Sequence, residues 1–216
     1  MKKLPIAKLP LLFAAISGEK TLYIPAQDAA SVSKFTVWQE GMTLSPALNT
    51  VRSAKDLFFP QVENLMGFKV TGKQIELLEN RDVTAPFVLF GVRACDCRSF
   101  DVLDRVFLAE PVDTYYQTRR ENATIVTLAC TEPEETCFCG TFSIDAADPA
   151  GDVTCWMDEE NLYWRANTEK GESLTASLSL LEDGIATFLA VAVVLLFAKP
   201  LLAIFNSDPD VVALGY

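Results

Sequence analysis

Residues 86–97 read PFVLFGVRACDC, and this stretch decides the fold because it joins a buried strand to two cysteines. The run from Pro86 to Val92 is continuously apolar, which is typical of a strand covered on both faces in a parallel sheet. Residues 123–130, ATIVTLAC, contain a second apolar run that ends in Cys130. We therefore expect two buried strands, each followed directly by cysteine.

The segment between these two runs has the spacing of a helix. Over residues 96–108 apolar side chains recur on one face, at Phe100, Leu103, Val106 and Phe107. The order strand, helix, strand predicts an α/β fold with a mixed or parallel sheet and flanking helices. If the two strands are parallel neighbours, the cysteine loops lie together at their carboxyl ends, where α/β sheets place their binding sites.

Composition excludes several classes of function. The chain has 216 residues and a formal charge of −11, which disfavours binding to nucleic acid and to anionic membrane surfaces. It contains no histidine, so it cannot build a Ser-His-Asp unit or a His-ligated metal site from its own residues. We find no motif for independent catalysis. A soft metal would have to be held by the six cysteines.

The cysteines are clustered along the chain, which argues against a disulfide framework. Cys130, Cys137 and Cys139 have C-x6-C-x-C spacing in a loop, and an iron–sulfur cluster needs four thiolates together with backbone amides. We choose Cys95 as the fourth ligand, with Cys97 as the alternative. From the residues alone, zinc binding and unligated cysteines stay open beside the cluster hypothesis. Arg93 is a candidate for offsetting cluster charge or binding an anionic group, and an ordinary salt bridge is the alternative.

The two ends of the chain differ from the middle. Residues 1–18 have some features of a signal peptide, but Lys8 and two prolines interrupt them, and a short amphipathic helix is our preferred interpretation. We assign residues 1–180 to one α/β domain and residues 181–216 to an apolar helical tail. Residues 185–205 reach the ~20 residues of a membrane span only by including Lys199 and Pro200, so we expect a buried or partner-facing helix and keep a membrane segment as the alternative.

Several motifs together resemble one family, the 4Fe-4S dicluster proteins similar to the beta subunit of sulfhydrogenase and to the corresponding subunit of anaerobic sulfite reductase. The resemblance covers roughly residues 9–172. It rests on Thr50–Ser53, Phe58–Gln61, Gly91–Arg93 with Cys95-Asp96, Val102–Phe107, Tyr115-Tyr116, Arg119–Asn122, and Cys130–Cys139 with Glu132-Pro133 and Thr136.

The resemblance implies an electron-transfer subunit of a cytoplasmic oxidoreductase complex. Its partners would be a flavin- and NAD(P)-binding subunit together with a catalytic subunit, such as a hydrogenase or a sulfite reductase. The cysteines that match the family's pattern, as ligands of a 4Fe-4S cluster, are Cys95, Cys130, Cys137 and Cys139. A scaffold or interaction subunit with zinc-bound or free cysteines is the alternative function.

The sequence also departs from this family. Its members carry a C-terminal ferredoxin-like domain with two runs of four cysteines, and no cysteine follows Cys155 here. The apolar tail does not resemble the family, and Cys97 is not an expected cysteine position. We expect either a truncated or frameshifted product or a single-domain variant.

Overall fold

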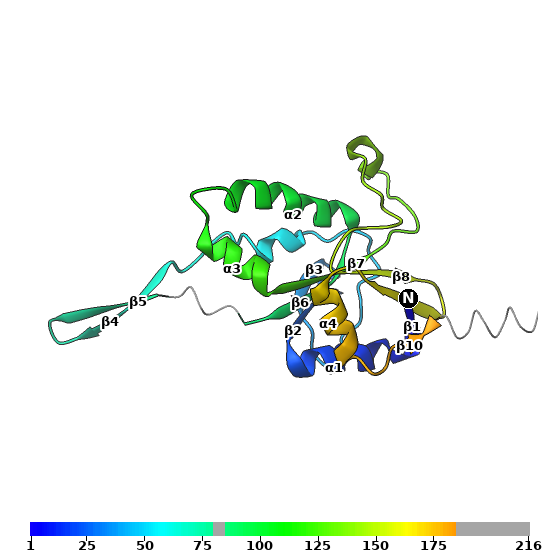
Figure 1. The fold of residues 1–216 in the computed structure, drawn as a ribbon, viewed down its shortest axis with the longest axis horizontal. Coiled ribbons are helices and arrows are strands. Elements are labelled where there is room, and N and C mark those ends of the chain that lie inside the picture. The colour runs from blue at the N-terminus through cyan, green and yellow to red at the C-terminus, as the bar shows by residue number, and fades with distance from the viewer. Residues whose placement is uncertain (80–84, 185–216) are drawn as a thin grey trace, which may run out of the picture.

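The computed structural model describes residues 1–79 and 85–184. Within them, strands and helices alternate along much of the chain (Figure 1). The strands are β1 (Lys2–Pro5), β2 (Thr21–Gln27), β3 (Ser33–Val37), β4 (Met66–Thr71), β5 (Gln74–Glu79), β6 (Phe87–Val92), β7 (Ala123–Leu128), β8 (Val153–Met157), β9 (Asn161–Ala166) and β10 (Glu182–Asp183). The helices are α1 (Leu9–Glu19), α2 (Ala94–Phe107), α3 (Thr114–Asn122) and α4 (Glu169–Ser177), with 3-10 turns η1 (Ile6–Lys8), η2 (Ala54–Leu57) and η3 (Cys139–Phe142).

The described strands form an eight-stranded sheet in the order β10-β1-β9-β8-β7-β6-β2-β3, and β4 pairs separately with β5. The centre is parallel, since β2 pairs with β6, β6 with β7 and β7 with β8 in that sense. Antiparallel strands extend the sheet on both sides. The predicted mixed α/β sheet with flanking helices is therefore confirmed.

Side chains of each central strand alternate between two apolar cores because successive residues point to opposite faces of a sheet. Val88 and Phe90 of β6 contribute to the core that contains α1 and α4 residues. Phe87 and Leu89 contribute to the core beneath η2, α2 and α3. The helices thus cover both faces of the sheet (Figure 1). Both strands predicted to be buried, β6 and β7, are buried at every position.

Helix α2 follows the predicted segment but not every predicted side chain faces inward. Phe100 is fully buried, whereas Val106 is 63% exposed, so the expected position of Val106 on the apolar face is wrong. Helix α3 begins after Asp113, whose carboxylate accepts hydrogen bonds from the amides of Tyr115 and Tyr116. Such N-caps satisfy amides that lack helical partners.

An ion pair joins α3 to α2. Arg120 donates two hydrogen bonds of 3.0 Å to the carboxylate of Asp104. The hydroxyl of Tyr116 donates to the same carboxylate at 2.6 Å. The guanidinium also lies over the rings of Phe58 and Phe100. This network fixes the two helices over one face of the sheet.

The C-terminal tail falls outside the description. Residues 185–205, the expected apolar helix, lie outside the described residues, so that hypothesis stays a prediction. Across residues 1–79 and 85–184, no helix is both long and apolar enough to span a membrane.

Candidate functional site

The cysteines that follow β6 and β7 lie at the same edge of the sheet. The two strands pair in parallel, with a register shift between Phe90 and Val92. Cys95 lies in the first turn of α2, directly after β6, and Cys130 lies two residues beyond β7. The sequence-based inference that Cys95 and Cys130 share one edge is therefore confirmed.

Backbone hydrogen bonds shape the loop that carries the other cysteines. The amide of Cys130 donates to the carbonyl of Ala146 at 2.9 Å, which closes the loop at its base. Within it, the amide of Cys137 donates to the carbonyl of Glu134, while the amide of Glu134 donates to the sulfur of Cys137 at 3.3 Å. Figure 1 shows this loop, between β7 and β8, extending away from the sheet. These hydrogen bonds close the base of the loop and fix the turn that leads into Cys137.

Three cysteines line one cavity of about 400 Å³. Cys95 comes from the start of α2, and Cys137 and Cys139 come from the loop. Much of the remaining wall is apolar, including Phe35, Leu48, Pro25, Phe138 and Ile144. A cavity with soft thiolate donors and apolar walls suits an iron–sulfur cluster, whose potential depends on burial and on hydrogen bonds to sulfur.

Burial and neighbouring charges raise the pKa of the Cys95 and Cys130 thiols. Burial is the main cause of the raised pKa of Cys95, followed by the charges of Asp96 and Cys139. Burial also raises the pKa of Cys130, an effect that the guanidinium of Arg93 opposes and the nearby Cys139 and Cys137 reinforce. Cys130 does not line the cavity, but it directly follows Ala129, whose carbonyl accepts a hydrogen bond from the cavity residue Arg93. Because metal ligands must be deprotonated, cluster binding would release protons here.

Arg93 connects the loop before η2 to the end of β7. Its guanidinium donates hydrogen bonds to the carbonyls of Leu48, at 3.2 Å, and Ala129, at 3.1 Å. A longer bond of 3.4 Å reaches the carbonyl of Leu128. Its acceptors are backbone carbonyls, which do not cancel its charge, and the described residues give it no ion pair. The positive charge is therefore left to act on the cavity that Arg93 helps to line.

The remaining two cysteines point elsewhere. Cys97 belongs to the core under α2, and its thiol donates to the carbonyl of Ala150 at 3.0 Å. Burial raises its pKa to about 12. Cys155 is fully buried in the other core, and burial raises its pKa well above its usual value. Neither residue lines the cavity, which favours Cys95 over Cys97 as a ligand.

Sequence reasoning gave the segment before η2 no place in the candidate site. Ser53 accepts a hydrogen bond from the amide of Lys55, and its hydroxyl donates to the carboxylate of Asp96 at 2.6 Å. This contact ties the segment to the start of α2, next to Cys95. The sequence feature that could have revealed this part of the site is Thr50–Ser53, which we used only as one of the motifs matching the family. The local pattern alone does not show that these residues cover a cavity built from later parts of the chain.

Among residues 1–79 and 85–184, no three or more Cys, Asp or Glu side chains are grouped so as to hold a single metal ion.

Comparison with curated proteins finds a match to a component of a sulfhydrogenase. The relative is the sulfhydrogenase 2 subunit beta of Pyrococcus furiosus, which is 44% identical over 90 residues, or 42% of this chain and 27% of the relative. The resemblance inferred from the motifs is confirmed over that stretch. The match thus spans little more than a quarter of the relative's length. No model of a known protein family matches the sequence, and no solved structure matches it.

Proposed function

We propose that this chain is an electron-transfer subunit, or a domain of one, that holds a 4Fe-4S cluster through Cys95, Cys130, Cys137 and Cys139. One observation carries the proposal: cysteines from two distant segments converge at the carboxyl ends of adjacent parallel strands, around one largely apolar cavity. The similarity to a sulfhydrogenase beta subunit supports it. A bound cluster of this kind takes up and releases single electrons.

The protein's own residues would control water access to the cluster and offset part of its charge. Phe35, Leu48 and Ile144 would limit the access of water from the cavity walls. The guanidinium of Arg93 would offset part of the negative charge of four thiolates, since its hydrogen bonds to carbonyls leave its charge uncompensated. The chain lacks histidine, which fits transfer of electrons rather than independent catalysis.

The partners that we propose follow the resemblance. A flavin- and NAD(P)-binding subunit would supply or accept electrons, and a hydrogenase-type or sulfite-reductase-type subunit would carry out the reaction. We place the complex in the cytoplasm, because all six cysteines are free thiols and such thiols persist in a reducing compartment.

The test is the content of iron and acid-labile sulfide after anaerobic purification. We expect about four of each per chain, and a loss of both in Cys137→Ser. Cys97→Ser is the matched control, because a serine hydroxyl can keep the hydrogen bond to the carbonyl of Ala150. This variant should retain its iron.

Zinc, or no metal, in the wild-type chain would refute the proposal and favour the scaffold or interaction subunit. Loss of iron in Cys97→Ser together with its retention in Cys95→Ser would leave a cluster protein with a different fourth ligand.

A further inference from the structure

The hairpin of β4 and β5 has one face that is apolar over most of its length. Phe68 pairs with Leu77 and Val70 with Ile75, so the members of each pair share a face. Met66 lies on this face because it is two residues before Phe68. Each of these five side chains is between 57% and 69% exposed. We call this set of five the hairpin face.

The opposite face of the hairpin is mainly polar. Lys69 pairs with Glu76, and Thr71 pairs with Gln74. Only Leu78, near the base and 43% exposed, adds a large apolar side chain there within the described part of the hairpin. Alternation of apolar and polar residues is typical of a sheet with one face packed and one face in water. The hairpin therefore has the pattern of a covered sheet, although its apolar face is exposed in the single chain.

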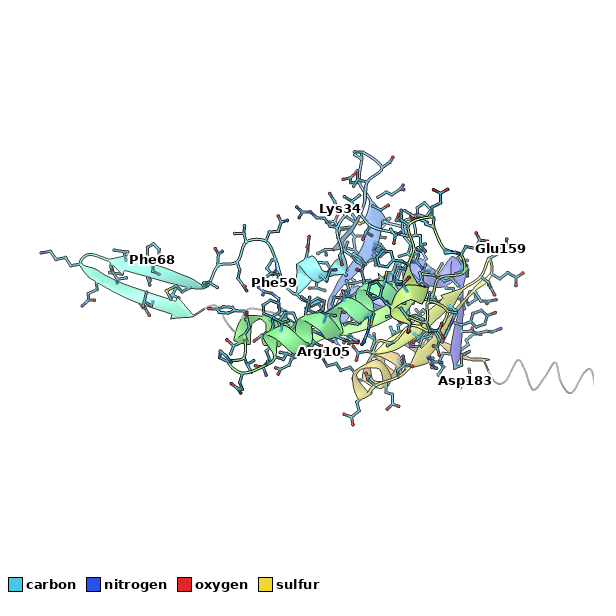
Figure 2. All side chains as sticks on the ribbon, turned by 90° about the horizontal axis from the view of Figure 1, so that it is seen from above. Lys34, Phe59, Phe68, Arg105, Glu159 and Asp183 are labelled. Carbon is cyan, nitrogen blue, oxygen red and sulfur yellow. The ribbon has the colours of Figure 1, made fainter. Side chains whose placement is uncertain are left out.

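The hairpin projects from a fixed base (Figures 1 and 2). Glu63 forms an ion pair with Arg119 of α3, and the hydroxyl of Tyr115 donates to the carbonyl of Leu65. These contacts anchor the chain just before β4. Figure 2 shows Phe68 on the hairpin, away from the body of the protein. An isolated two-stranded hairpin is at best marginally stable in water, so a surface that covers the hairpin face would stabilise it.

The area of the hairpin face favours a second copy of this chain as that cover. The face exposes on the order of 600 Å², so two of them would bury about 1,200 Å², the lower limit of stable protein interfaces. The hairpin face of a second copy is an apolar surface of the same size and shape, so it can cover this one completely.

Charge permits the same arrangement. All five side chains of the hairpin face are uncharged, so no like charges meet across the contact. The net charge of −11 does disfavour contact between two whole bodies. Each hairpin strand has six residues and spans roughly 20 Å, so two hairpins packed with their tips in opposite directions keep those bodies farther apart than the ~8 Å over which salt screens charge.

We propose that the hairpin face packs on the same face of a second copy, so that the chain forms a two-fold dimer. Such an interface is isologous, meaning that the same patch serves both partners. The result would be a small two-layer sandwich of four strands. The dimer would form with or without a bound cluster.

The test compares two adjacent residues on opposite faces. Sedimentation equilibrium of the full chain should show a reversible equilibrium between 23.8 kDa and twice that mass over about 1–100 µM. Ile75→Lys places a charge in the hairpin face and should weaken the dimer at least tenfold. Gln74→Lys adds the same charge on the polar face and should leave the dimer within about twofold of wild type. Circular dichroism should be alike in all three, since both side chains are exposed.

A wild-type chain that stays monomeric throughout this range would overturn the proposal. So would a dimer that Ile75→Lys leaves intact, because association would then use another surface. Leu77→Lys provides a second variant on the hairpin face and should act like Ile75→Lys. High salt should preserve the dimer, since the contact is apolar, whereas dissociation by salt would contradict the proposed packing.

Discussion

Replacing Gly91 by alanine tests the backbone geometry that leads into the cysteine site. Gly91 lies at the register shift in β6 and has a φ of +87°. An added Cβ would lie 2.9 Å from Cδ of Pro25 and 3.0 Å from its Cγ. The left-handed backbone costs about 1–2 kcal/mol for alanine, and the overlap with a ring in a packed region adds roughly 1–3 kcal/mol. We therefore expect Gly91→Ala to lower the free energy of unfolding by about 2–5 kcal/mol.

The assay is urea denaturation followed by tryptophan fluorescence, with a second glycine as control. Gly41 has nearly the same φ, +88°, but its added Cβ would meet nothing within 4 Å. Gly41→Ala should thus show the backbone cost alone, about 1–2 kcal/mol. The difference between the two variants measures the overlap with Pro25. Equal losses in Gly41→Ala and Gly91→Ala would refute the steric reasoning and show that the Pro25 ring moves freely.

Three further predictions concern other parts of the molecule. In cluster-free protein at pH 8, iodoacetamide should label exposed Cys137 much faster than Cys97, whose pKa burial raises to about 12; equal rates in peptide mass spectrometry would contradict this. A double-mutant cycle of Asp104→Asn and Arg120→Met should give a coupling energy of at least about 1 kcal/mol, because the ion pair is bidentate and largely buried. If urea denaturation shows that the two single losses of unfolding free energy simply add in the double mutant, this coupling is refuted. Hydrogen bonds from the backbone amides of Asn161 and Glu160, and from a tyrosine hydroxyl, lower the pKa of Asp158. The stability from this carboxylate is present above its unfolded pKa and is lost as pH falls through the folded value, so an NMR titration should find the folded value below 3.8.

The central strands and the cysteine edge could be predicted because their signals are local. The apolar runs of β6 and β7 are continuous, and cysteine follows each directly. Parallel pairing then places Cys95 and Cys130 together by the geometry of the sheet alone. Cys137 lines the same cavity as Cys95 because the loop between β7 and β8 carries it there.

Other parts depend on contacts that no short window of sequence contains. β1 is four residues long and includes Pro5, so it has no strand pattern of its own and is defined by pairing with β9. Val106 has helical spacing but lies about 120° around α2 from the buried Phe100, outside the arc that packs on the core. The cavity wall at Leu48 comes from a segment without regular structure, held there by Arg93. Tertiary contacts decided each of these features.

The position of β1 in the sheet also has a consequence for synthesis on the ribosome. Lys2 pairs with Trp164, so β1 finds this partner only after more than 150 further residues have been made. At about 5–20 residues per second, the wait is roughly ten to thirty seconds. During this time the apolar side chains of Leu4, Leu12 and Phe13, which the finished protein buries almost completely, lack the later strands that cover them. Until β9 emerges, the nascent chain therefore exposes apolar side chains of β1 and α1 that only the completed sheet covers.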